Sequence, residues 1–350
     1  MASNDIYKKL ISFRKELHSE PELSWNEYRT SERLINFISG FDPDEIITGI
    51  AGTGLAVVFE GIIEGPTVLI RSELDALPIS EINSFDYRSK REGVSHKCGH
   101  DGHMAMVAGM AQVLSESRPE KGRTVLLFQP AEETGEGAAR VISDSKFEII
   151  RPDYIFAAHN LPGYQLNSIV IGYDNFASAS RGMVIKLTGK TSHAAEPSRG
   201  LSPALAMSNI IRELTFIGSG GKNYRDFILS TVVHARLGEV ALGTSPGEAE
   251  VIATLRAVLD SDMELLAGSA SEITGKIAAE AGLDIDINWV QEFPSTVNDI
   301  SCSELIAKSA DNKGFETQII DKPFRWSEDF GHFTGRFLGA LFGIGSGTGH

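Results

Sequence analysis

The chain has 350 residues, of which 42% are hydrophobic and 23% are charged. These values are typical of globular proteins and exclude a mainly disordered or fibrous chain, and the length favours two domains with a sizeable buried core. The 47 acidic and 32 basic residues give a formal net charge of -15, and the basic residues are scattered along the sequence. Nucleic acid is therefore not an expected partner.

The N-terminal stretch MASNDIYKKLISFRKELH has the pattern of an amphipathic helix rather than of a signal peptide, and the longest apolar runs are only as long as a strand. We therefore expect a cytoplasmic protein without a membrane segment. The two cysteines, Cys98 and Cys302, cannot build a disulfide framework. Cys98 lies among histidines, which suits a reducing compartment where thiols serve metals or catalysis.

After the N-terminal helix, the first half of the chain alternates between strand and helix patterns. Separate strands joined by helices indicate a mostly parallel sheet that is covered on both faces. The predicted strands lie at 55–60, 67–71, 123–128 and 154–158, and the predicted helices between them lie at 104–116 and 137–144.

The pattern changes near residue 182 to strand, helix, strand, strand, helix and strand, which is the ferredoxin-like order. These elements are predicted at 183–188, 203–216, 227–237, 249–259, 262–281 and 283–290. Residues 293–299 are predicted to form a return linker, and a helix at 301–313 and a strand at 315–320 follow it. We therefore predict an α/β protein in which a ferredoxin-like α+β domain, residues 181–292, is inserted into a mostly parallel-sheet domain formed by 1–180 and 293–350.

The motif HKCGHDGH (96–103) places three histidines and a cysteine in eight residues. Cys98 and His100 precede the helix predicted to start near Asp101, so both side chains can point toward one place. A thiolate and an imidazole two residues apart begin a metal site but do not complete it.

Further metal-binding side chains follow two of the predicted strands. Glu132 and Glu133 come after the strand at 123–128, and His159 comes after the strand at 154–158. Ligands of open parallel sheets bind at the carboxyl ends of strands, so we expect these side chains to meet Cys98 and His100 at one edge.

Each of these residues alone also has a structural explanation. A histidine at a strand end is more often only hydrogen bonded, a Glu pair often forms a solvated turn, and an isolated cysteine is usually a small buried hydrophobe; their convergence favours a metal site. For His96 and His103 the structural interpretation is preferred, because Cys98 and His100 already fill the local geometry. We expect Asp101 to be a helix N-cap and a partner of the ligands rather than a ligand.

Seven segments carry a recognisable pattern: LHSEPELSWNE (17–27), RSELDALPI (71–79), HKCGHDGHMA (96–105), QPAEETGEGA (129–138), AAHNLPG (157–163), GKTSHAAEP (189–197) and SEDFGHF (327–333). Together they resemble the amidohydrolase branch of the M20 metallopeptidase family. That branch includes N-acyl-amino-acid, hippurate and auxin-conjugate hydrolases. The resemblance spans nearly the whole chain in the expected order.

This resemblance implies a di-metal catalytic domain with an inserted lid or dimerisation domain. It implies metal ligands at Cys98, His100, Glu133 and His159. Two divalent ions per complete active site are expected, and the mixture of thiolate, imidazole and carboxylate suits Zn²⁺, with Mn²⁺, Co²⁺ and Ni²⁺ as alternatives.

The resemblance also implies catalytic roles. Glu132 falls on the family's catalytic carboxylate and His193 on a lid histidine that helps to hold the reacting carbonyl. Bound metal lowers the pKa of water toward ~7; Glu132 then takes its proton for the leaving nitrogen, and His193 donates to the oxyanion. Arg256 matches a lid arginine that faces a substrate carboxylate, or else is an exposed arginine of a strand.

The chain departs from the family pattern at three places. Glu73 stands where many relatives have Asp, and Gly243-Thr244-Ser245-Pro246 stands where relatives often have Asn-Val-Ile-Pro, which puts an asparagine contact to substrate in doubt. Relatives continue past the glycine-rich stretch to a histidine that completes the ligands of the second metal. We expect His350 to precede that ligand rather than to be it, so that a chain truncated there binds the second metal weakly and has poor activity.

Three functions follow from this reading. The leading one is a metal-dependent amidohydrolase of N-acyl amino acids or similar small amides. The second is the same chemistry on dipeptides, as a dipeptidase or carboxypeptidase. The third is a metal-binding homologue with impaired catalysis, against which the retention of Glu132 argues. We also expect a homodimer through the inserted domain, with His193 reaching the active site of the neighbouring subunit.

Overall fold

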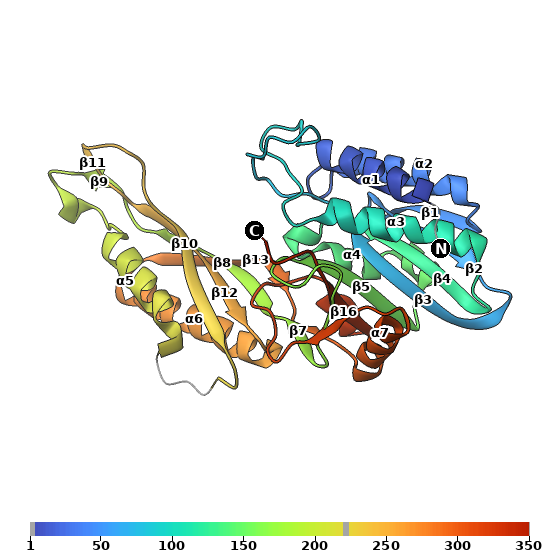
Figure 1. Ribbon diagram of the computed structural model, residues 1–350. Coiled ribbons are helices and arrows are strands. Elements are labelled where there is room, and N and C mark those ends of the chain that lie inside the picture. Colours follow the sequence, from blue (N-terminus) through green and yellow to red (C-terminus); the bar gives the residue numbers. More distant parts are fainter. Residues whose placement is uncertain (1–3, 220–223, 350) are drawn as a thin grey trace. The chain divides into compact units, whose positions relative to one another are not determined.

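The computed structural model describes residues 4–219 and 224–349, which divide into two compact units (Figure 1). The first unit takes in the described residues of Met1–Phe176, Thr296–Pro323 and Glu328–His350. The second takes in the described residues of Ala177–Ser295 together with Phe324–Ser327. The second unit is therefore an insertion in the chain of the first.

The first unit is built on a large sheet. Its strands are β1 (Glu45–Ile50), β2 (Gly54–Glu60), β3 (Ile63–Glu73), β4 (Lys121–Gln129), β5 (Tyr154–Leu161), β6 (Ile169–Ile171), β15 (Thr317–Ile319) and β16 (Leu338–Gly345). They are arranged in the order β1-β2-β4-β3-β5-β16-β6-β15. The central pairs β4–β3, β3–β5 and β5–β16 are parallel, whereas β1–β2, β2–β4 and β16–β6 are antiparallel. The sheet is thus parallel in its centre and mixed toward its edges, since the tight turn from β1 to β2 reverses the chain.

Helices pack against this sheet. They are α1 (Asn4–Ser19), α2 (Tyr28–Ile38), α3 (His100–Glu116), α4 (Gly137–Ser143), α7 (Ile300–Asn312) and α8 (Gly331–Thr334). Figure 1 shows α1, α2 and α3 side by side along the sheet. Phe13 and Leu17, one turn apart on α1, join Leu126 and Phe128 of β4 in one buried apolar cluster, as expected of amphipathic helices that cover a sheet.

The second unit is built on a four-stranded antiparallel sheet with the order β10-β12-β8-β13. In chain order its main elements are β8 (Ala179–Thr188), α5 (Ala204–Thr215), β10 (Ile228–Leu237), β12 (Glu248–Ala257), α6 (Asp260–Glu280) and β13 (Asp284–Phe293). Alternate residues of β12, among them Val251, Ala253 and Leu255, are buried with residues of α5 and α6, the period of a strand with one covered face.

Short strands complete the two units. β9 (Ser192–His193) pairs with β11 (Thr244–Ser245), and β7 (Asn175–Ala177) pairs with β14 (Thr296–Val297). None of these short strands was predicted from the sequence. Among the described residues, no helix combines the length and the apolar character that crossing a membrane requires.

The protein is an α/β protein with a large central sheet, as its sequence predicts. The helix predicted at 203–216 is α5, and the strand predicted at 249–259 is β12. The predicted order of elements between 183 and 290 is present, with boundaries shifted by a few residues. β1, β6 and β16 were not predicted, because their sequences lack a clear alternation of apolar and polar residues.

Candidate metal centre

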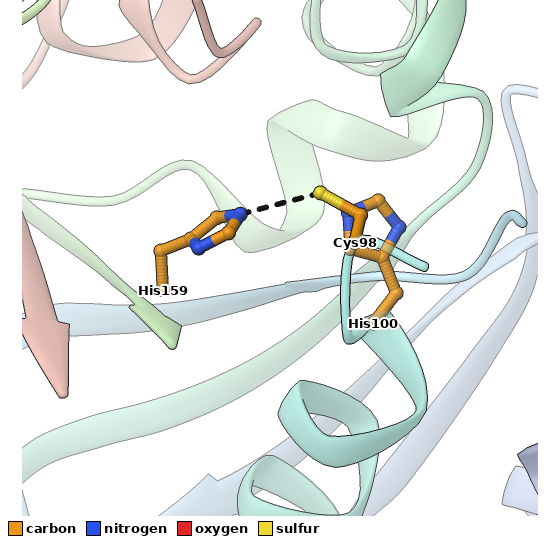
Figure 2. Close-up of side chains that lie close together, drawn as sticks. All are labelled: Cys98, His100 and His159. Carbon is orange, nitrogen blue, oxygen red and sulfur yellow. Dashed lines mark hydrogen bonds between the residues drawn. The ribbon is translucent and has the colours of Figure 1, made fainter. Parts of the chain in front are cut away.

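Three of the predicted ligands come together at the ends of their elements. Figure 2 shows Cys98 beside His159, with Cys98 Sγ 3.5 Å from His159 Nε2. His100 is the first residue of α3, and His159 lies near the end of β5. Possible ligand atoms of these three side chains all lie within 4.8 Å of one another, so a thiol and two imidazoles face one small volume.

The two predicted carboxylates adjoin the same histidine. Glu132 and Glu133 begin η2 (Glu132–Thr134), the short 3₁₀ helix that follows β4. His100 Nε2 lies 3.8 Å from Glu132 Oε2 and 3.8 Å from Glu133 Oε1. His100 therefore belongs both to the group with Cys98 and His159 and to the group with the two carboxylates.

Two buried carboxylates hold the turn that carries Glu132 and Glu133. Ala131 adopts a left-handed conformation with φ 53°, which is uncommon for a residue with a side chain and must be held by its surroundings. Its N–H donates to Glu27 Oε1 across 2.9 Å. The N–H groups of Glu132 and Glu133 donate to the two oxygens of Asp75, across 3.1 and 3.0 Å. Three successive N–H groups thus fix the turn.

Hydrogen bonds also set the tautomers of the two histidines. His100 Nδ1 lies 2.8 Å from the main-chain oxygen of Asp75, and His159 Nδ1 lies 2.8 Å from that of Asn160. A carbonyl oxygen only accepts, so Nδ1 carries the proton in both rings and each Nε2 keeps its lone pair when the ring is neutral. Both Nε2 atoms therefore suit metal coordination.

The residues present fit a divalent metal ion. His100 Nε2 and Glu133 Oε1 are buried and have no hydrogen-bond partner among the residues that the structure describes. Such atoms carry a desolvation cost that a bound cation would offset. Imidazole nitrogen, carboxylate oxygen and thiolate sulfur are donors for Zn²⁺ and similar ions.

Burial shifts the pKa of the ionisable groups at this centre. Burial, together with the charge of Glu328, raises the pKa of Glu132 well above its ordinary range. Burial also raises the pKa of Glu133 to about 7 and raises the pKa of the Cys98 thiol. It lowers the pKa of His159 to about 3. A bound cation would favour the ionised forms of the carboxylates and the thiol, and would therefore lower their pKa values.

Comparison with known proteins decides the family. The profile of Peptidase family M20/M25/M40 matches residues 69–350. The chain belongs to this family. It is therefore a hydrolase of amide bonds, as its sequence predicts, and divalent metal ions fit its described donor groups.

Named relatives of this M20 protein include deacetylases and amino-acid conjugate hydrolases. The N-acetyl-L-cysteine deacetylase of Bacillus subtilis is 30% identical over 351 residues, covering 99% of this chain and 82% of the relative. The IAA-amino acid hydrolase ILR1-like 4 of Arabidopsis thaliana is 28% identical, and the match covers 94% of this chain and 75% of the relative. The solved structure of the Bacillus subtilis YXEP protein, a dinuclear metal-binding peptidase from the M20 family, has a TM-score of 0.80 at 26% identity and covers 98% of this chain and 90% of its own.

The other histidines of HKCGHDGH play different parts in this M20 protein. His103 Nε2 accepts from the N–H of Asn160 across 2.9 Å, and its Nδ1 lies 2.9 Å from Glu73 Oε2. His103 is thus held between α3, β3 and the end of β5, but it also lies in a metal-capable group with Glu73 and His100, so its structural role stays a prediction. His96 is buried and belongs to none of the metal-capable groups among the described residues.

The prediction that Asp101 caps α3 is wrong. The helix begins at His100, and Gly99, at φ 92°, takes the N-cap position without a side-chain cap. Asp101 lies inside the first turn, where its Oδ2 accepts from Arg14 Nε across 2.6 Å and pairs with His18 Nδ1 at 2.9 Å. It therefore joins α3 to α1 and makes no hydrogen bond to the predicted ligands. The N-cap thus lies two residues before the predicted one, at a glycine whose positive φ other residues rarely adopt.

Two predicted site residues lie in the second unit. His193 is exposed on β9, and its Nδ1 accepts from the N–H of Ala195 across 3.1 Å. Arg256 of β12 is half-buried, and its Nη1 donates to the main-chain oxygen of Arg325 and to Ser327 Oγ, across 3.1 and 3.0 Å. Arg256 is therefore not a freely exposed arginine. The catalytic role of His193 and the substrate-binding role of Arg256 stay predictions, and His350 lies outside the described residues.

Sequence reasoning assigned no role to several buried charged residues around the centre. Glu27, Arg71 and Asp329 are each at most 1% exposed. The sequence feature that could have pointed to them is a group of charged residues directly after an apolar strand, as in RSELD after TVLI. Because charges are seldom fully buried unless paired, such a run indicates a polar network inside the fold.

Proposed function

We propose that this M20 protein is a metal-dependent amidohydrolase that cleaves the amide bond of N-acyl amino acids or similar small amides. The observation that supports it best is the convergence of Cys98, His100, Glu133 and His159 beside a further buried carboxylate, Glu132. A site that only stores or stabilises metal has no use for such a carboxylate. The names of the deacetylase and conjugate-hydrolase relatives support the substrate class.

In this proposal Cys98, His100, Glu133 and His159 hold the metal, with two ions in a complete site. The donor set suits Zn²⁺ best, with Mn²⁺, Co²⁺ and Ni²⁺ as alternatives. When bound, such ions act as Lewis acids and lower the pKa of water toward ~7. Because Cys98 must stay a free thiol, a reducing compartment such as the cytoplasm belongs to the same proposal.

Glu132 is the proposed general base and acid. It takes a proton from the attacking water and delivers it to the leaving nitrogen, a role for which a pKa raised by burial is suited. Its N–H is held by Asp75, so its main chain cannot drift during the transfer. Of the two carboxylates, Glu133 has a buried oxygen without a hydrogen-bond partner among the described residues, so we assign the metal to Glu133 and the proton transfer to Glu132.

We propose that the second unit, whose sheet has the order β10-β12-β8-β13, is a ferredoxin-like lid and dimerisation domain. His193 would donate to the carbonyl oxygen of the substrate, and Arg256 would bind its carboxylate with the guanidinium donors that Arg325 and Ser327 do not use. The exposed edge strands β10 and β13 offer surfaces for a two-fold interface. Mixing Glu132→Gln and His193→Ala subunits should restore partial activity if His193 serves the neighbouring subunit.

A substrate panel with metal analysis tests the function. N-acetyl and N-benzoyl amino acids should be hydrolysed faster than dipeptides, and Glu133→Gln should lose part of the bound metal because it removes a charged donor. Faster turnover of dipeptides would identify a dipeptidase or carboxypeptidase. Stable metal binding without turnover of any member of the panel would identify a metal-binding homologue with impaired catalysis.

A further inference from the structure

One residue of the SEDFGHF segment reaches the proposed general base. Asp329 is fully buried, and its main-chain N–H donates to Glu132 Oε1 across 3.2 Å. The two residues are far apart in sequence, and their carboxylates form, with that of Glu328, a group separate from the one that includes Cys98 and His159. Any displacement of Asp329 therefore moves a hydrogen-bond partner of the Glu132 carboxylate.

The side chain of Asp329 is anchored by three donors from three different elements. Its Oδ1 accepts from Arg71 Nη2 across 2.6 Å. Its Oδ2 accepts from Gln129 Nε2 across 2.7 Å and from the N–H of Ala138 across 2.8 Å. These donors lie on β3, on β4 and at the start of α4. A buried carboxylate with three charged or polar donors has one favourable position.

Arg71 is the cation at the centre of this network. Its side chain is completely buried and pairs with Glu73, Glu328 and Asp329. Its Nε also donates to Gln129 Oε1 across 2.8 Å. A planar guanidinium can serve several acceptors at fixed angles at once, which the single ammonium of a lysine cannot do. Arg71 therefore orders the carboxylates that surround it.

We propose that Asp329 is a positioning residue for Glu132, held in place by Arg71 and Gln129. The inference rests on the proposed function, because Asp329 acts on the reaction only through the proton transfer assigned to Glu132. Asp75 fixes the main chain of Glu132, and the N–H of Asp329 fixes the direction of its carboxylate. Misplacing a reacting group by 1 Å costs about 10²-fold in rate.

The first test is Asp329→Asn. The amide has nearly the shape of the carboxylate but cannot accept from all three donors, so the segment should shift. We expect kcat to fall about 10- to 100-fold, with KM changed less than about twofold, because only an interaction of the transition state is lost. Metal content should equal that of the unmodified protein. The matched control is Asp311→Asn, the same change at an exposed residue of α7, which should leave kcat unchanged.

A double-mutant cycle separates positioning from a general structural effect. In the Glu132→Gln background, Asp329→Asn should lower the residual rate by less than about twofold, because the group it positions is absent. An equal fall in both backgrounds would overturn the inference, and so would a folded Asp329→Asn variant with unchanged kcat. Full activity of Glu132→Gln alone would instead overturn the proposed base, and the inference with it.

A milder variant keeps the test decisive if Asp329→Asn does not fold. Gln129→Met removes one donor to Asp329 without changing any charge. We expect kcat to fall by a smaller factor, about 3- to 10-fold, and only while Glu132 is present. Unchanged kcat in this variant, with metal content equal, would show that the anchoring of Asp329 does not matter for Glu132.

Discussion

The two units bury different kinds of side chain. Around the metal centre the first unit buries Arg71, Glu73, Asp75, Glu132 and Asp329, all at most 4% exposed. The buried core of the second unit, by contrast, is an apolar cluster drawn from alternate strand residues and from the facing sides of α5 and α6.

The second unit buries one charged side chain among its described residues. Asp262 accepts from the N–H groups of Arg225 and Asp226, so it only satisfies main-chain donors next to α6. Buried charges lower stability unless they are paired and hydrogen bonded. The first unit therefore contains a buried polar network that lowers stability but serves the reaction, whereas the buried residues of the second unit mainly stabilise its fold. Substitutions in the first unit should therefore mainly lower activity, whereas substitutions in the core of the second should mainly lower the free energy of unfolding.

The largest expected effect is on the chemistry of the first unit. Glu132→Gln should lower kcat roughly 10²–10⁴-fold, because it removes the general base while keeping the size of the side chain. Steady-state kinetics together with elemental analysis check it. Near-native turnover at equal metal content would show that Glu132 is not the general base. The buried Glu132 carboxylate would then serve only the fold.

The next effect belongs to the core of the second unit. Leu255→Ala should lower the free energy of unfolding by about 2–5 kcal/mol, because it leaves a cavity in a fully buried cluster. Urea unfolding measures this, and metal content should not change. The matched control is Leu242→Ala, at a fully exposed leucine of the same unit, which should change the free energy by less than about 0.5 kcal/mol. Equal effects of the two changes would contradict the comparison.

Metal removal should act on the first unit alone. At a free metal concentration 100 times the Kd, a site that binds only the folded state stabilises it by about 2.7 kcal/mol. A chelator should therefore lower the melting temperature of the protein. Glu133→Gln, which lacks one proposed donor, should respond less. A melting temperature that is insensitive to chelation would argue against a resident metal.

The smallest expected effect is at the rim of the first unit. Burial alone would raise the pKa of Glu81, but hydrogen bonds from the N–H of Ser89 and from the side chains of Asn83, Lys97 and His18 lower it to about 2. A carboxyl with a lowered pKa stabilises the fold above its ordinary pKa, and this contribution is lost as pH falls toward 2.

Glu81→Gln should therefore be less stable than the unmodified protein at pH 7 by about 1–2 kcal/mol, after allowance for solvent screening. The gap between the two proteins should close as the solution is acidified below the ordinary pKa. Urea unfolding at several pH values measures it, and a gap that does not depend on pH would mean that the shift at Glu81 is absent.

Local pattern was enough to predict the main members of the candidate site. Cys98 and His100 stand out by their spacing, and Glu133 and His159 stand out because each comes at the end of an apolar run. In a parallel sheet, strand ends meet at one edge, so position along the chain translates directly into position in space. The order of elements in the second unit was predictable for a similar reason, since the apolar period of each element is local.

Which distant segments pack against each other was not predictable from the sequence. Gly343 allows β16 to lie close to β5, since a Cβ there would come within 2.1 Å of Leu161 Cδ1, yet the glycines of LGALFGIG remove the apolar alternation that marks a strand. Likewise, the contacts of His103 with Glu73 and Asn160 join elements that are far apart in the sequence, so no local pattern specified them.

The sequence by itself determined the family, the α/β class, and the residue types that converge at the ends of β4, β5 and the start of α3. The tertiary structure alone decided that Asp101 faces α1, that Arg71 lies among three carboxylates, and that Asp329 meets Glu132. Secondary structure follows from short-range periodicity along the chain. The pairing of buried charges instead depends on contacts between residues as many as 258 positions apart, whose partners no local pattern specifies.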